Sequence, residues 1–205
     1  MQQATNRDAQ IVVGIMQSMA SALIFVAVLG LSPFNSIQAA QEIRSYERET
    51  QLLLAASIGN VVEVQELIAG GVDVNAQFGK YPETALMAGS HYPEIVKLLL
   101  VAGADVHARN VIQETALMYS VDGHGTTTTK MLIAGGSDVN AYDKSGKTAL
   151  MIAAAGGYKK NIEILLASGA DLNGRDKKNK TALRYALEEK QFRAVKVLRE
   201  AGGIE

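Results

Sequence analysis

Two short signals recur along this chain of 205 residues at nearly constant intervals. The first is the triplet Thr-Ala-Leu, which begins at Thr84, Thr115, Thr148 and Thr181. Its intervals are 31, 33 and 33 residues. The second is a Gly-x-Asp turn, whose aspartates are Asp73, Asp105, Asp138 and Asp171, spaced by 32, 33 and 33 residues. Because two independent markers share one period, the chain is predicted to fold as a stack of repeated units.

The stretch from Lys144 to Asn173 shows one unit in its most regular form. A polar turn precedes Thr148, and the small residues 149–155 suit a helix. Two glycines then interrupt the pattern, and a second apolar segment, 162–166, ends shortly before Gly169. Glycine tolerates the backbone conformation that commonly ends a helix. The unit is therefore predicted to be helix, turn, helix and loop.

These motifs resemble the ankyrin repeat, in which Thr-Pro-Leu-His starts the first helix and Gly-Ala-Asp-Val-Asn ends each unit. The resemblance implies an all-α fold, a solenoid of about five helix-turn-helix units with hairpin loops. An N-terminal hydrophobic helix is expected to precede this array, because of the apolar run described below. The expected units are approximately 45–76, 77–108, 109–141, 142–174 and 175–205. Here alanine replaces the proline, and methionine, or Arg184 in the last unit, replaces the histidine. Buried methionines are expected to stand in for the histidine hydrogen bond.

The third unit departs most from the pattern in its second helix. Four consecutive threonines, 126–129, precede its apolar residues. Threonine is a poor helix former because the preceding turn restricts its χ1 angle. We expect this outer helix to be the least stable of the five.

Residues 11–31 form an uncharged run that is long enough to cross a bilayer. Ser32, Pro33 and a polar stretch follow, and then Ala39 and Ala40 supply the small residue that signal peptidase requires. We expect residues 1–40 to be an export signal peptide, or alternatively an uncleaved membrane anchor, ahead of an array at 41–205. The expected location is the periplasm or the cell exterior, with the membrane surface as the alternative.

The charge of the chain is balanced overall but uneven along its length. A formal net charge of −1 predicts no bulk attraction to nucleic acid. Residues 41–141 carry six basic and twelve acidic side chains, whereas residues 142–205 carry thirteen and eight. This uneven charge distribution would orient a charged partner electrostatically or pair two copies of the chain end to end. The alternative is that the charges only form a solvated surface whose composition varies along the chain.

Nothing in the sequence favours catalysis. The chain has no cysteine, which excludes disulfides and thiolate chemistry. His91, His107 and His124 fall in three different loops, without the spacing of a helical metal pair. The repeated aspartates suit loop closure through bonds to nearby backbone. The protein is therefore predicted not to be an enzyme and to need no cofactor or metal.

The family resemblance implies that hairpin tips and inner helices line a concave surface that binds another protein. Two roles follow for such an array. It is either a periplasmic accessory to another protein of the same cell, or a secreted effector that binds a host protein. The array itself is expected to be monomeric. Apolar residues occupy hairpin tips where polar residues are expected: Tyr81, Val111 and Ile112. They indicate either a contact site for a partner or packing between neighbouring hairpin tips. The candidate binding residues are Lys80, Tyr81, His91, Tyr92, Val111, Ile112, Asp122, Lys144, Lys147, Lys177 and Lys178.

Overall fold

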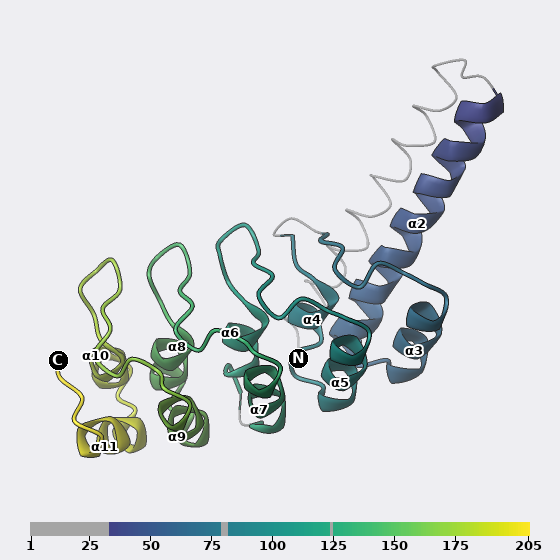
Figure 1. Ribbon diagram of the computed structural model, residues 1–205. Helices are drawn as coiled ribbons and strands as arrows, with labels where there is room; N and C mark the ends of the chain where they lie inside the picture. The colour runs from purple at the N-terminus through teal and green to yellow at the C-terminus, as the bar shows by residue number, and fades with distance from the viewer. Residues whose placement is uncertain (1–32, 79–81, 124) are drawn as a thin grey trace.

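The computed structural model describes residues 33–78, 82–123 and 125–205, with side chains from residue 44 onward. In Figure 1 pairs of helices stand side by side in a single row, and hairpin loops project from one side of that row. Within the described residues every regular element is a helix, and two isolated β-bridges, Phe78 with Glu83 and Tyr142 with Thr148, close hairpins. The predicted all-α stack is confirmed there, while the predicted hydrophobic helix at 11–31 lies outside the described residues.

Each unit contributes an inner helix followed by an outer helix. The pairs are α2 (Pro33–Ile58) with α3 (Val61–Ala69), α4 (Ala85–Ala88) with α5 (Pro93–Val101), α6 (Ala116–Ser120) with α7 (Thr127–Ala134), α8 (Ala149–Gly156) with α9 (Lys159–Ala167), and α10 (Ala182–Glu188) with α11 (Phe192–Glu200).

The recurring threonine starts four of the inner helices. In each case its Oγ1 accepts a hydrogen bond from the backbone N–H three residues later, at 3.2–3.4 Å. This is an N-cap bond, which satisfies a donor that has no partner inside the helix. The leucine of the triplet is buried in all four units, so the motif sets both the start of the helix and its buried face.

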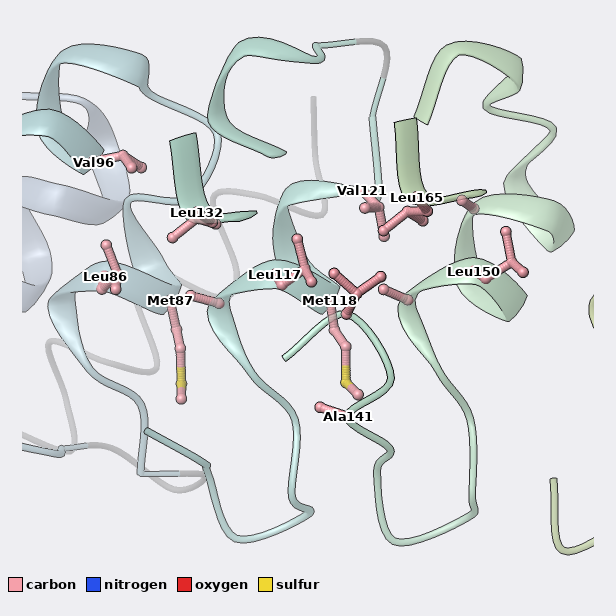
Figure 2. Close-up of a cluster of buried hydrophobic side chains, with 14 of the residues drawn as sticks. Leu86, Met87, Val96, Leu117, Met118, Val121, Leu132, Ala141, Leu150 and Leu165 are labelled. Atoms are coloured by element: carbon pink, nitrogen blue, oxygen red, sulfur yellow. The ribbon is translucent and has the colours of Figure 1, made fainter. Parts of the chain in front are cut away.

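The methionines that replace the expected histidine are buried, as predicted. Met87, Met118 and Met151 are only 1%, 3% and 2% exposed. Figure 2 shows Met87 and Met118 extending from the inner helices toward the hairpins. In the last unit Arg184 is exposed instead, and its Nε lies 3.0 Å from Glu188 Oε1. Apolar packing therefore replaces a polar link in the inner units.

The recurring Asp and Asn close each unit and tie it to the next. Each aspartate accepts a hydrogen bond from the backbone N–H two residues later, at 2.8–3.0 Å, which confirms the predicted loop-closing role. Asn75 and Asn140 each bond both to a backbone carbonyl and to a backbone N–H of the following unit. In the described part of the chain, His107 fills this position without making such a bond. The second and third units therefore lack this link.

The first inner helix is longer than the others. α2 runs from Pro33 to Ile58 without a break, so the polar stretch that follows Pro33 in the sequence is helical. Proline suits this first position because its missing N–H needs no partner there. Figure 1 shows the N-terminal part of α2 projecting beyond the row. The domain boundary at 40/41 stays a prediction, and α2 crosses it.

Among the described residues, no helix is both long enough and apolar enough to cross a membrane. The run at 11–31 lies outside the described residues.

The outer helix of the third unit is short and weakly capped. α7 has eight residues, and Thr126 makes no side-chain cap bond. We expect its amides to exchange with solvent about tenfold faster than those of α9, because α7 contains three threonines, which are poor helix formers, whereas α9 contains none and likewise lacks a side-chain cap bond. Hydrogen exchange followed by mass spectrometry measures both helices in one experiment. Equal protection of α7 and α9 would show that the threonine run does not weaken the helix.

Candidate protein-binding surface

The hairpin tips are held in shape by one side chain each. Oδ1 of Asn110, Asp143 and Asp176 accepts hydrogen bonds from the backbone N–H groups two and four residues later, at 2.7–3.0 Å. Two bonds to one oxygen close the turn and fix the backbone that follows. The tips of the third, fourth and fifth units therefore share one conformation.

Neighbouring tips are also bonded to one another. The backbone N–H of Lys144 donates to the carbonyl of Ile112 at 2.8 Å, and that of Lys177 donates to the carbonyl of Ser145 at 2.9 Å. These bonds join residues 111–113, 144–147 and 177–180 into a continuous surface, which we call the tip row. The tip row carries six of the predicted binding residues.

The tip row exposes both apolar and basic side chains. Val111 and Ile112 remain 42% and 38% exposed although neighbouring tips are in contact. Packing between tips, the alternative raised by the sequence, does not bury them. Lys144, Lys177 and Lys178 are exposed and Lys147 is half-buried. Within the part of the chain that the structure describes, none of these four lysines forms a salt bridge.

Three of the other predicted residues, His91, Tyr92 and Asp122, lie at the opposite end of the inner helices, in the connections to the outer helices. His91 is exposed there. The ring of Tyr92 covers Gly59, where an added Cβ would lie 2.5 Å from its Cε1 atom. Asp122 Oδ1 accepts a hydrogen bond from Tyr158 Oη at 3.3 Å. Tyr92 and Asp122 therefore serve contacts between units, and the predicted residues form two separate sets.

Lys80 and Tyr81 belong to the tip of the second unit and lie outside the described residues. Their predicted role in binding stays a prediction.

Two tyrosines that the sequence analysis did not select connect inner helices to hairpins. Tyr119 and Tyr185 each lie four residues after a capping threonine. Tyr119 Oη donates to Glu83 Oε1 at 2.5 Å, and Tyr185 Oη donates to Asp176 Oδ2 at 2.6 Å. Burial, together with these carboxylate acceptors, raises the pKa of both phenols. Comparing the same position across all units would have found them.

A charged cluster surrounds Tyr185. The Nζ atoms of Lys147 and Lys180 lie 4.8 and 5.4 Å from the centre of its ring, within the range of a cation–π contact. Lys180 and Arg184 also donate to Glu188, and these bonds hold the pKa of that carboxyl below its ordinary value. Lys147 therefore adds positive charge within the tip row, while Lys180 is paired with Glu188.

The repeated geometry agrees with a comparison to known families. A family model described as ankyrin repeats (3 copies) matches residues 88–176 and also residues 117–205. Together the matches cover more than half of the chain. The chain belongs to the ankyrin-repeat family. A search of curated proteins found no match.

Membership of the family establishes the general role of the array. Ankyrin repeats are protein-interaction modules and are generally non-catalytic. The match begins at residue 88, the last residue of α4, and the structure adds one earlier helix pair of the same kind, α2 with α3, together with the rest of α4. No group of three or more metal-ligating side chains is found among the described residues.

Proposed function

We propose that this ankyrin array binds its partner protein on the concave side, at the tip row of the third, fourth and fifth units. One observation carries the proposal: a hydrogen-bonded row of tips holds two exposed aliphatic side chains beside four lysines that have no ion-pair partner among the described residues. Exposed apolar groups favour a contact site, and the neighbouring charges favour a partner of opposite sign. Because the tips are bonded to one another, little ordering is needed on binding.

The aliphatic pair supplies a direct test. We expect Ile112→Asp to weaken the affinity for a partner, obtained by affinity capture from the source cell's envelope, by about tenfold or more. A carboxylate there would remove apolar contact area and would remain charged in the interface. Calorimetric titration measures the affinity, and the melting temperature should not change, because the Ile112 side chain is already 38% exposed.

The matched control is Val62→Asp. Val62 is 65% exposed in the first turn of α3, far from the tip row in sequence, and an acidic residue is tolerated at a helix N-terminus. Partner affinity should be unchanged in this variant. Equal affinity of Ile112→Asp and the unaltered protein would remove the tip row as the binding site.

For location, we propose export to the periplasm or the cell exterior, with residues 1–40 removed. The alternative is an array held at the membrane by residues 11–31. α2 passes through Ala39 and Ala40, so cleavage there requires that this part of the helix be unfolded. The N-terminal residue and intact mass of the protein purified from its own cell decide between them. A start at Ala40 or Gln41 supports export, whereas full-length protein in the membrane fraction supports the anchor.

A further inference from the structure

A ladder of side chains runs along the first strand of each hairpin. The position two residues after the loop-closing Asn or His is occupied by Gln77, Arg109, Tyr142 and Arg175. Gln77 Nε2 donates to the carbonyl of Arg109 at 3.0 Å, and Arg109 Nη1 donates to the carbonyl of Tyr142 at 3.0 Å. Among the residues that the structure describes, the side chain of Tyr142 donates no such bond to the next unit. Among the described hairpins, the ladder stops between the fourth and fifth units.

A cavity of about 400 Å³ opens at this break. Its lining includes Tyr142, Thr148, Met151, Gly174, Arg175 and Lys177. Such a volume is in the range of protein sites that hold small ligands or single anchoring groups. We call it the inter-hairpin pocket.

Two departures from the repeat accompany the pocket. Tyr142 replaces a side chain that would bridge to the next unit. Gly174 occupies the position of Ala76, Ala108 and Ala141, and an added Cβ there would lie 3.1 Å from Asp171 Oδ2. Gly174 itself lines the pocket, and the atoms nearest to an added methyl group all belong to Asp171, another lining residue. The repeat therefore departs from its pattern between the fourth and fifth hairpins.

The exposed charges around the pocket are mainly positive. Lys177 is exposed, and so are the neighbouring Lys144 and Lys178 of the tip row. Arg175 is exposed too, and its Nη1 and Nη2 donate to the backbone carbonyls of Asn179 and Glu205 at 2.9 and 3.0 Å, which hold the guanidinium in place. The carboxylates in the lining are engaged by the hairpins: Asp176 accepts from two backbone N–H groups and from Tyr185, and Asp171 accepts from the backbone of Asn173. A ligand therefore meets exposed lysines and a fixed arginine, while both lining carboxylates already accept hydrogen bonds.

Aromatic surface is also available. The side chain of Tyr142 is 60% exposed, and its ring lies 6.0 Å from the guanidinium carbon of Arg109. Exposed tyrosine gives a large, rigid contact area and is favoured at binding sites. Arginine is well suited to a carboxylate because its fork matches the two oxygens.

We propose that the inter-hairpin pocket receives an apolar side chain from an acidic segment of the partner protein. The apolar side chain packs against Tyr142, and flanking carboxylates pair with Arg175 and Lys177. This inference rests on the proposed protein-binding function and assigns it a partner chemistry: residues 142–205 have a net charge of +5, which favours an acidic ligand.

The probe is a labelled peptide, acetyl-Glu-Glu-Phe-Glu-Glu-amide, titrated into the full chain at low salt and followed by fluorescence anisotropy. We expect saturable binding that weakens as salt is added. Tyr142→Ala and Lys177→Glu should each reduce the affinity about fivefold or more. Gly174→Ala, which restores the residue of the other units, should weaken binding by narrowing the pocket while leaving every charge in place.

Controls separate a shaped site from general charge attraction. Lys160→Glu makes the same charge change on the exposed surface of α9 and should leave affinity within about twofold. A peptide with alanine in place of phenylalanine should bind more weakly, and an all-lysine version of the peptide should not bind. The melting temperature of each variant, taken from circular dichroism, shows that it is folded.

Several results would overturn the inference. Equal losses for Lys160→Glu and Lys177→Glu, or equal binding of a thymidine oligonucleotide of the same charge, would show attraction by charge alone. Unchanged peptide affinity in Tyr142→Ala would remove the pocket. Absence of peptide binding together with concentration-dependent dimers in sedimentation would assign the basic surface to a second copy of this chain. A captured partner that depends on Ile112 but not on Tyr142 would leave the proposed function intact and remove only this site.

Discussion

Replacing Asn161 with alanine should lower the free energy of unfolding by about 3 kcal/mol. Asn161 lies in α9 and is only 1% exposed. Its Nδ2 donates to the carbonyls of Val121 and Gly123 at 3.3 and 3.1 Å, in the preceding unit. Alanine leaves these acceptors without their donor, and Val121 is fully buried. An unsatisfied buried polar group costs more than the loss of an ordinary exposed bond.

The amide is also matched to hydroxyl groups. Asn161 Oδ1 accepts from Thr129 Oγ1 at 3.4 Å, and Thr129 Oγ1 lies 3.2 Å from Ser120 Oγ. In the second unit the positions of Asn161 and Thr129 are occupied by the buried aliphatic residues Ile95 and Val96. A polar network therefore replaces apolar packing between the third and fourth units.

Urea denaturation of the purified array measures the effect. Lys160→Ala is the control, since Lys160 is exposed on the preceding position of the same helix and should cost less than about 0.5 kcal/mol. The double variant Asn161→Ile with Thr129→Val should cost less than the sum of its single changes, because removing both partners leaves fewer unmatched groups. If Asn161→Ala costs no more than Lys160→Ala, the network does not hold the two units together.

Local signals in the sequence predicted the unit well. A threonine that caps its own helix and an aspartate that bonds two residues ahead act over a few residues, so their spacing was enough to place inner helices and loops. The burial of Met87 and Met118 followed from the repeat pattern in the same way. Such features recur in nearly every unit and need no knowledge of the neighbouring unit.

Contacts between units were not predictable from the same signals. Thr129 and Asn161 are 32 residues apart, and neither residue type favours the helix in which it lies. The threonine run was interpreted only as a source of weakness, yet Thr128 and Thr129 are buried and Thr129 is bonded to Asn161 of the next unit. Helix propensity does not record a partner supplied by another repeat.

The candidate site shows the same division. The sequence selected Val111 and Ile112 because they are apolar at a tip, and the structure confirms their exposure. The sequence did not show that neighbouring tips are hydrogen-bonded to one another. It also did not show that Tyr92 and Asp122 make contacts between neighbouring units. The Ile112→Asp variant tests whether this surface binds a partner.

A second large effect is expected at the tip of the fifth unit. Asp176→Ala should lower the free energy of unfolding by about 3 kcal/mol at neutral pH. Asp176 is 6% exposed and accepts three hydrogen bonds, from the backbone N–H groups of Lys178 and Lys180 and from Tyr185 Oη, at 2.6–2.9 Å. Alanine removes all three, and the buried phenol of Tyr185 loses its acceptor. Urea denaturation measures the loss.

The third unit supplies the matched control for this change. There Asn110 closes the tip with the same two backbone bonds, and its Nδ2 donates to Tyr119 Oη at 3.2 Å. Asp176→Asn should adopt this arrangement with Tyr185 and cost only about 1 kcal/mol, the difference between charged and neutral acceptors. A loss as large as that of alanine would mean that the negative charge, rather than the closure of the tip, stabilises the fifth hairpin.

The dependence of protein stability on pH gives an independent measure of the contribution of the Asp176 charge. Burial alone would raise the pKa of Asp176, but the bonds from Tyr185 and from the backbone of Lys180 and Lys178 outweigh it and hold the pKa below its ordinary value. A carboxyl whose pKa is lower in the folded state stabilises the fold fully above the ordinary carboxyl pKa, about 4, and loses this contribution as pH falls through the lower folded value. The stability difference between the unaltered protein and Asp176→Asn should therefore be largest at neutral pH and shrink as the solution is acidified below about pH 4. A difference that stays constant across that range would show that the three hydrogen bonds do not depend on the ionised form of Asp176.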